Sequence, residues 1–182
     1  MALTATTADT FDALNRLADR FARLAEERSQ GQPAALKVLI AEDDLLIADM
    51  MEAVLLSHGY DVCGIARTVA EAVELGSTSK PDLAILDLRL ANAGLGTEIA
   101  ARLGDRGRLG VLYATGNAST IALTATDGDA CLSKPYRPDD LLRSLKLVVD
   151  IVVNGEAVPP YPRNFHLLRT SAMSALEPSG VC

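Results

Sequence analysis

The chain of 182 residues lacks the features that mark membrane, exported and nucleic-acid-binding proteins. Its longest apolar stretch falls far short of the roughly 18 residues that a membrane-spanning helix needs. Asp9, Asp12 and Arg16 stand where a signal peptide would have an uninterrupted apolar segment. No run of five basic residues occurs and the net charge is −7, which argues against sequence-independent binding to nucleic acid.

Cysteine is scarce as well. Cys63, Cys131 and Cys182 are odd in number, lie far apart and include no CxxC pair. They are typical of a reduced protein, because neither a disulfide framework nor a zinc site has this pattern. We therefore predict a soluble cytoplasmic protein with no membrane and no nucleic acid among its partners.

What the chain does have is a regular alternation of strand-like and helix-like segments. Short branched-aliphatic runs predict buried strands, and longer amphipathic segments predict helices. The strands are expected at 38–41, 62–66, 83–86, 109–114 and 130–133, and the helices at 45–58, 69–75, 97–103, 118–126 and 138–153. This alternation predicts an α/β domain over 36–154, a doubly wound, five-stranded parallel sheet in the flavodoxin-like order 2-1-3-4-5.

Segments on either side of this domain are expected to add to it. Residues 1–35 form a helix and linker, with the helix over 9–29, and residues 155–182 form a C-terminal extension. Leu14, Leu17, Phe21 and Leu24 give the first helix an a/d pattern. It either packs on its own domain or joins two copies. The extension is either disordered or docked in part through its apolar residues.

The helix over 45–58 is expected to present six apolar residues to the core: Leu46, Ile47, Met50, Met51, Val54 and Leu55. Asp44 comes just before this helix. We interpret it as a solvated residue at the helix start, because its side chain should point away from the sheet edge.

Two of the predicted strands end in acid. Glu42 and Asp43 follow the first strand, and Asp87 follows the third. Since the carboxyl ends of parallel strands meet at one edge of the sheet, these carboxylates should lie close together. Such a cluster repels itself unless a divalent cation or protons neutralise it.

The fourth and fifth strands bring a hydroxyl and an ammonium group to the same edge. Thr115 ends the fourth strand and Lys134 follows the fifth. Both side chains can bind the oxygens of an anion. Together with the acids and a cation they predict a site at which an aspartate receives a phosphoryl group.

Four sequence pieces in this order resemble the receiver domain of two-component response regulators. They are VLIAEDD at 38–44, PDLAILDLRL at 81–90, ATG at 114–116 and SKPY at 133–136. The resemblance covers about residues 36–154. It implies a single-domain response regulator that accepts a phosphoryl group from a sensor histidine kinase and then acts through protein contacts or as a phosphate sink.

The resemblance also implies a role for each matching residue. Asp87 is the phosphoacceptor, and Thr115 and Lys134 bind the phosphoryl oxygens. The resemblance further implies a cis peptide between Lys134 and Pro135. Glu42, Asp43, Asp87 and the backbone carbonyl of Arg89 hold Mg²⁺, with Glu42 acting mainly through water.

The chain departs from the family at two places that concern the switch. Cys131 stands where the family has an aromatic residue, and we expect it to pack instead of react. Tyr113-Ala114-Thr115-Gly116 is similar to the FATG motif of an alphaproteobacterial subgroup of single-domain receivers, although the aromatic residue that follows in that subgroup is absent.

Two other functions compete with this one. The protein could be a pseudo-receiver, an unphosphorylated dimeric interaction module that pairs through the first helix or the last helix, 138–153. A haloacid-type hydrolase also uses a strand-end Asp with Mg²⁺, but it needs an acid two residues later, where this chain has Arg89. We therefore expect no enzyme.

The a/d pattern of the first helix gives a test of dimerisation. Leu17→Asp combined with Phe21→Asp should shift a dimer toward monomer, because each change puts a carboxylate into the apolar seam. Light scattering measures the mass. An unchanged mass would mean that the helix packs on its own domain.

Overall fold

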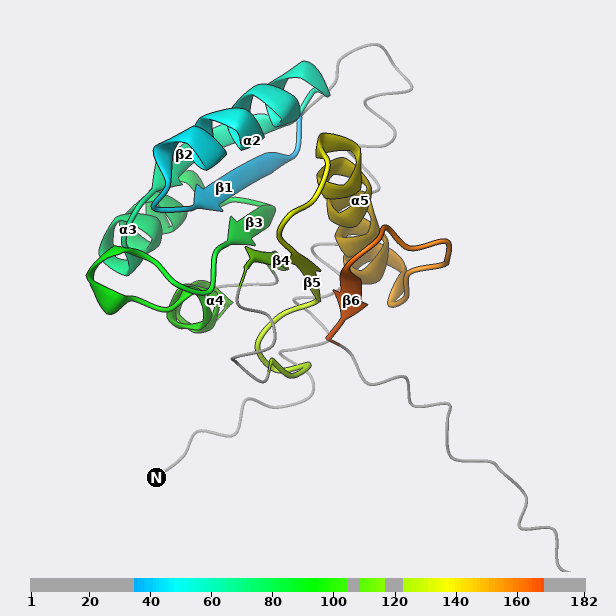
Figure 1. The fold of residues 1–182 in the computed structure, drawn as a ribbon. Helices are drawn as coiled ribbons and strands as arrows, with labels where there is room; N and C mark the ends of the chain where they lie inside the picture. Colours follow the sequence, from blue (N-terminus) through cyan, green and yellow to red (C-terminus); the bar gives the residue numbers. More distant parts are fainter. Residues whose placement is uncertain (1–34, 105–108, 117–122, 169–182) are drawn as a thin grey trace, which may run out of the picture.

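The computed structural model describes residues 35–104, 109–116 and 123–168. Six strands form one sheet in the order β2-β1-β3-β4-β5-β6 (Figure 1). The strands are β1 (Lys37–Ala41), β2 (Asp61–Ala66), β3 (Leu83–Leu86), β4 (Gly110–Thr115), β5 (Ala130–Ser133) and β6 (Phe165–Leu167). The predicted order of the first five strands is confirmed, and all of their pairings are parallel.

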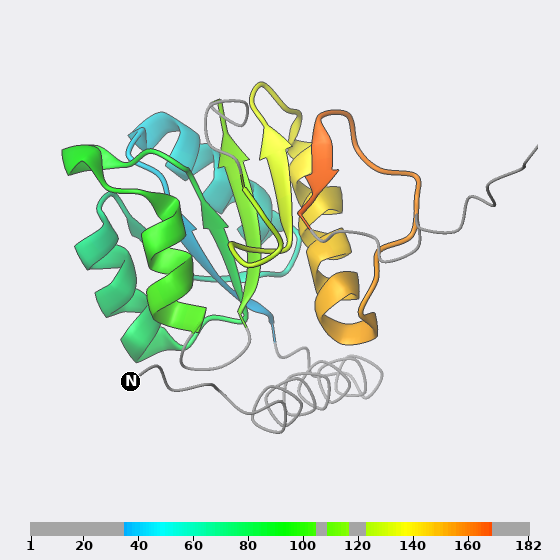
Figure 2. The ribbon, with the colours of Figure 1, turned by 90° about the horizontal axis from the view of Figure 1, so that it is seen from below.

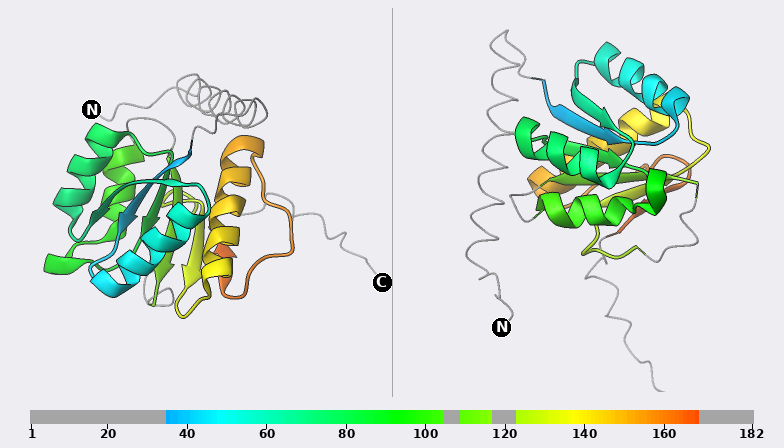
Figure 3. Two further views of the ribbon diagram at one scale, coloured as in Figure 1. Left: turned by 90° about the horizontal axis from the view of Figure 1, so that it is seen from above. Right: turned by 90° about the vertical axis from the view of Figure 1, so that its left-hand side faces the viewer.

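Helices cover both faces of this sheet (Figures 2 and 3). They are α2 (Leu45–Ser57), α3 (Val69–Ser79), α4 (Gly96–Gly104) and α5 (Pro138–Asn154), and a short 3-10 helix, η1 (Ala91–Ala93), follows β3. One apolar core joins α2 and α5 to the sheet, and a second joins α3 and α4 to the opposite face.

The strand sequences explain why the sheet is buried on both sides. Val38 and Ile40 belong to the core under α2 and α5, and Leu39 and Ala41 belong to the core under α3 and α4. Successive side chains of a strand point to opposite faces. An unbroken aliphatic run is therefore what a parallel sheet between two helix layers requires.

The sixth strand is a difference from the predicted five-stranded sheet. It comes from the C-terminal extension and pairs antiparallel with β5. The expectation that part of the extension docks on the domain is confirmed for the residues described. Three residues that include His166 give too short a pattern to predict a strand.

The predicted inner face of α2 was wrong at two positions. Leu46 is 81% exposed and Met50 is 36% exposed, whereas Ala48, Met51 and Leu55 are buried. The prediction followed side-chain size, but the small Ala48 is one of the residues that face inward. Leu45, Leu46, Met50 and Leu56 remain exposed. The first three lie within the first two turns of the helix and are here called the α2 patch.

Three further local predictions concern Asp44, the helix over 9–29 and the segment 118–126. Asp44 is exposed at the start of α2, as predicted. It also caps the helix, since its Oδ1 accepts hydrogen bonds from the amides of Leu46 (2.9 Å) and Ile47 (3.3 Å). The helix over 9–29 lies outside the described residues. The described part of the 118–126 segment, residues 123–126, is not helical.

Buried acids also stand at the opposite, amino-terminal edge of the sheet. Asp82 Oδ2 accepts a hydrogen bond from the amide of Lys37 (2.9 Å), and Asp129 Oδ2 accepts one from the amide of Val111 (2.9 Å). Both acids are almost completely buried. They satisfy backbone donors at the points where β1 and β4 begin. No helix in the described ranges is long and apolar enough to cross a bilayer.

The buried acid at position 129 has a measurable structural role. Asp129→Ala should lower the free energy of unfolding by about 1–3 kcal/mol, because the buried amide of Val111 would lose its acceptor. Urea unfolding measures the change. Asp49→Ala, an exposed change in the middle of α2, is the control and should have little effect. Equal stability of the two variants would contradict this role.

Candidate functional site

The acids, the threonine and the lysine singled out from the sequence come to one edge of the sheet. Strand register places them there: Ala41 is level with Leu86, and Thr115 is level with Ser133. Glu42 and Asp87 therefore follow neighbouring strands at the same height. Lys134 follows the strand that borders Thr115.

Lys134 bridges the two acidic strand ends. Its Nζ donates to Oε2 of Glu42 at 2.6 Å and to Oδ2 of Asp87 at 2.7 Å. Glu42 is 2% exposed and Asp87 is 9% exposed, so both ion pairs are shielded from water. One ammonium group thus forms ion pairs with two carboxylates that follow different strands.

Backbone hydrogen bonds fix the three residues of this bridge. The amide of Glu42 donates to Ala66 O (3.0 Å), and the amide of Asp87 donates to Ala41 O (2.8 Å). The amide of Lys134 donates to Thr115 O (2.9 Å). These bonds extend the ladder of the parallel sheet by one residue, which makes the site a continuation of the strands. The expected cis peptide between Lys134 and Pro135 is present.

The loop after Asp87 folds back onto the acceptor residue. The amide of Arg89 donates to Asp87 Oδ1 (3.2 Å), and a bridge pairs Arg89 with Leu95. This brings Gly96 so close that a Cβ there would overlap the carbonyl oxygen of Asp87. Glycine at position 96 is what allows the close approach.

The electrostatics of the site show an excess of negative charge. Burial raises the pKa of Glu42, and the charge of Asp87 adds to this effect, so that Lys134 offsets only part of it. For Lys134 burial acts to lower the pKa, but the hydrogen bonds to Asp87 and Glu42 outweigh it and raise the pKa. The lysine is therefore charged at neutral pH, while Glu42 carries its charge at a cost.

Metal binding can be judged from the donors present. Within the described ranges, no three His, Cys, Asp or Glu side chains lie close enough to hold an ion. Lys134 holds Glu42 and Asp87 together. Asp43, the residue after Glu42, is half-buried. The carboxylates have the oxygen chemistry that Mg²⁺ prefers, and two of them share a single ammonium group, which leaves negative charge for a cation to neutralise.

Thr115 and Cys131 lie where the sequence placed them. Thr115 is completely buried at the end of β4. Cys131 is buried in the core under α3 and α4, as expected for a packing residue, and burial raises its thiol pKa to about 11. Tyr113 is level with Cys131 on the neighbouring strand.

The hydroxyl groups of two tyrosines, Tyr113 and Tyr136, have surroundings that the sequence did not predict. The buried Tyr113 donates its hydroxyl to Asp127 O at 2.9 Å, which ties the loop before β5 to β4. Burial, and then the charges of Glu42 and Asp87, raise the pKa of Tyr136. The Tyr136 hydroxyl is buried without a hydrogen-bond partner among the described residues. Both residues belong to motifs noted in the sequence, but a motif does not reveal where a hydroxyl points.

A family model, described as the response regulator receiver domain, matches residues 38–146. This is more than half of the 182-residue chain. The chain belongs to the response regulator receiver domain family. The flavodoxin-like sheet is thus that of a receiver domain of two-component signalling.

Curated relatives are regulators from several bacteria. The transcriptional regulatory protein PdtaR of Mycobacterium tuberculosis is 32% identical over 116 residues, which is 62% of this chain and 56% of PdtaR. The phyllosphere-induced regulator PhyR of Methylorubrum extorquens is 34% identical over 106 residues, which is 57% of this chain and 40% of PhyR. The chain spans about half the length of the curated relatives it matches.

Solved structures give the same fold. A CheY-like receiver domain of Methanospirillum hungatei has a TM-score of 0.57 and 26% identity, covering 67% of this chain and 99% of that one. The anti-anti-sigma factor PhyR of Bartonella quintana has a TM-score of 0.54 and 27% identity, covering 75% of this chain and 56% of that one.

The raised pKa of Glu42 leads to a prediction about stability and pH. Because the folded protein binds this proton more tightly than the unfolded chain does, the Glu42 charge destabilises the fold at neutral pH. In buffer with a chelator, Glu42→Gln should raise the Tm at pH 7 by roughly 2–4 °C, which corresponds to about 1 kcal/mol. The gain should disappear below pH 4.5, where Glu42 is protonated in both states.

Differential scanning calorimetry at the two pH values measures this difference. Glu74→Gln, a change at an exposed position of α3, is the matched control. A Tm for Glu42→Gln that is lower than that of the parent at pH 7 would mean that the pair with Lys134 outweighs the burial of the carboxylate.

Proposed function

We propose that this receiver domain accepts a phosphoryl group on Asp87 from a phosphohistidine of a sensor kinase. The observation that carries the proposal is the bridge of Lys134 between Asp87 and Glu42, with Thr115 on the adjoining strand end. A carboxylate held beside a buried ammonium group and a hydroxyl suits the transfer of a phosphoryl group, because such catalysis depends mostly on positioning and charge neutralisation.

The proposed step follows from the contacts of Asp87. Its Oδ2 is bonded to Lys134 and its Oδ1 to the amide of Arg89, so the carboxylate is held in one orientation. A carboxylate oxygen attacks phosphorus, and the bond from phosphorus to the imidazole nitrogen breaks with its electron pair left on the imidazole. Lys134 and Thr115 then bind oxygens of the phosphoryl group.

We further propose that Mg²⁺ is the cofactor. Glu42, Asp43, Asp87 and the backbone carbonyl of Arg89 would hold it after the carboxylates turn from the arrangement described above, in which no three of them are close enough together. When bound, the ion supplies positive charge to the transferred phosphoryl group. The excess of two nearly buried carboxylates over one ammonium group supports this assignment.

The α2 patch supports a protein partner next to the site. Leu45 and Leu46 are exposed immediately after the acidic residues and the cap Asp44, so a protein that binds this patch lies beside Asp87. Apolar residues gathered on an exposed surface are typical of interaction sites. We propose that the kinase contacts the α2 patch.

Output through protein contacts is favoured over a phosphate sink by one comparison. The PhyR of Bartonella quintana, with which this chain shares its fold, is described as an anti-anti-sigma factor. We propose by analogy that a protein partner binds in a way that depends on phosphorylation of the receiver domain, 36–154. We place this interaction in the cytoplasm. The pseudo-receiver that dimerises without phosphorylation is the second candidate, and labelling distinguishes the two.

Asp87→Asn should abolish labelling by a small phosphodonor or a phosphorylated kinase in the presence of Mg²⁺, because the amide is not a nucleophile. Intact-mass spectrometry should find one added phosphoryl group on the parent chain and none on the variant. A chelator should reduce labelling of the parent by at least about tenfold, a loss of roughly 1.4 kcal/mol of transition-state stabilisation.

Asp44→Asn is the matched control for this experiment, since asparagine preserves a helix cap and the residue is placed outside the site. It should be labelled like the parent chain. Labelling of Asp87→Asn at the parental rate would refute the assignment of the acceptor. A parent chain that takes no label from any donor would favour the pseudo-receiver.

A further inference from the structure

The backbone around Lys134 is hydrogen-bonded on two sides. On the inner side the amide of Lys134 donates to Thr115 O (2.9 Å), and on the outer side the amide of Ser133 donates to Asn164 O (3.0 Å). Asn164 belongs to the segment that follows α5. The residue next to the site lysine is thus attached to the C-terminal extension.

This segment, residues 160–168, lies along the outer edge of β5 and is here called the strap (Figures 1 and 2). Leu132 is level with Phe165, and Ala130 is level with Leu167. At the far end of β5 the amide of Leu168 donates to Asp129 O (3.0 Å). The strap therefore closes the edge of β5, which would otherwise present unpaired backbone groups.

Among the described residues, the strap is held by apolar contacts at three points. Pro162 is buried, Phe165 is buried, and Leu168 packs against the core under α3 and α4. Phe165 is 7% exposed and enters the core under α2 and α5, and Tyr161 lies against its ring with centroids 5.5 Å apart. Nε of Arg143, on α5, donates to Pro160 O (3.0 Å). His166 and Leu167 are exposed. A three-residue strand with one buried side chain is the kind of element that opens locally before a domain unfolds.

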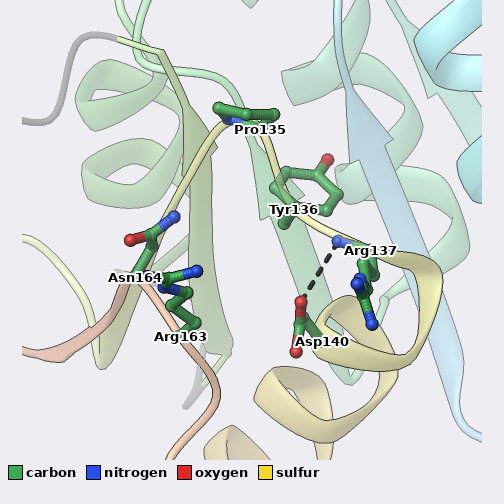
Figure 4. Close-up of a pocket in the computed structure, with 6 residues that line it drawn as sticks. All are labelled: Pro135, Tyr136, Arg137, Asp140, Arg163 and Asn164. Atoms are coloured by element: carbon green, nitrogen blue, oxygen red, sulfur yellow. Dashed lines mark hydrogen bonds between the residues drawn. The ribbon is translucent and has the colours of Figure 1, made fainter.

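A cavity of about 500 Å³ separates the strap from the loop that follows Lys134 (Figure 4). Arg163 and Asn164 of the strap lie on one side of it, and Tyr136, Arg137 and Asp140 lie on the other. The loop thus has space in which to move. The strap is connected to the site through its pairing with β5 and through the hydrogen bond from the Ser133 amide to Asn164 O.

We propose that the strap is the output element of this receiver, docked on β5 while Lys134 bridges Glu42 and Asp87 and released when Asp87 carries a phosphoryl group. This rests on the proposed function. A phosphoryl group on Asp87 adds oxygens that draw Lys134 away from Glu42. Lys134 and Ser133 are joined by a peptide bond. A shift of Lys134 toward the phosphoryl group therefore pulls on Ser133 and stretches the hydrogen bond from the Ser133 amide to Asn164 O.

Release of the strap changes what the domain offers to a partner. The freed edge of β5 exposes backbone donors and acceptors next to the apolar site that Phe165 leaves. An extended peptide with a large apolar side chain at one position fits such an edge. The strap is then an internal occupant of the surface that a partner's strand would use.

Hydrogen exchange on the full chain tests this directly. Beryllofluoride with Mg²⁺, an analogue of the phosphorylated aspartate, should speed exchange of the amides in 164–168 by at least about threefold. The amides of β2, at the opposite edge of the sheet, should exchange as before. Binding of the analogue with unchanged exchange in the strap would refute the proposal.

A reciprocal experiment uses the symmetry of coupled equilibria. Weakening the strap should strengthen binding of beryllofluoride by a similar factor, about threefold, in Phe165→Ala. Leu167→Ala, an exposed change in the same strand, is the control and should bind like the parent. Arg143→Ala loosens the strap without touching the core and keeps the test valid if Phe165→Ala fails to fold. Weaker or equal binding in both loosened variants would refute the coupling.

If the proposed function is wrong, the result differs from the one that refutes the coupling to the strap. A parent chain that does not bind beryllofluoride refutes phosphorylation of Asp87. The coupling is then tested without any analogue by Lys134→Gln, which removes the ammonium group from both carboxylates. Faster exchange in 164–168 would support the link between Lys134 and the strap, and unchanged exchange would refute it.

Discussion

The ion pairs of Lys134 with Glu42 and Asp87 are the interaction on which the rest of the site depends. They tie the ends of three strands that are far apart in the sequence. Without the lysine, two nearly buried carboxylates would face each other with no compensating charge, which is costly in a medium of low dielectric constant. The bridge therefore stabilises a group of acids that the fold alone would disfavour.

The position of these groups is a consequence of parallel topology. Each right-handed crossover returns the chain to the same end of the sheet, so the residues that follow β1, β3, β4 and β5 meet there. The buried acids at the other edge, Asp82 and Asp129, serve the backbone instead. One residue type thus has two roles, and the end of the strand at which it stands decides between them.

The sequence predicts well the strand order and the edge of the sheet at which Glu42, Asp87, Thr115 and Lys134 stand, because both depend on local patterns. Aliphatic runs locate the strands, and acids that end such runs identify the edge. The rotation of α2 was mispredicted because the prediction chose the large apolar residues, whereas Ala48 is completely buried and Leu46 and Met50 are exposed. The sixth strand and the bond from Tyr113 to Asp127 were missed because they join segments whose contact no periodicity records.

The glycine at position 96 limits what can be changed around the acceptor. It has no side chain and contributes no charge, yet it sets how near α4 can begin to the backbone of Asp87. Any larger residue there would push either the helix or the acceptor outward and lengthen the reach that Lys134 must cover. Attempts to redesign the specificity of this site must therefore keep a residue that takes no part in its chemistry.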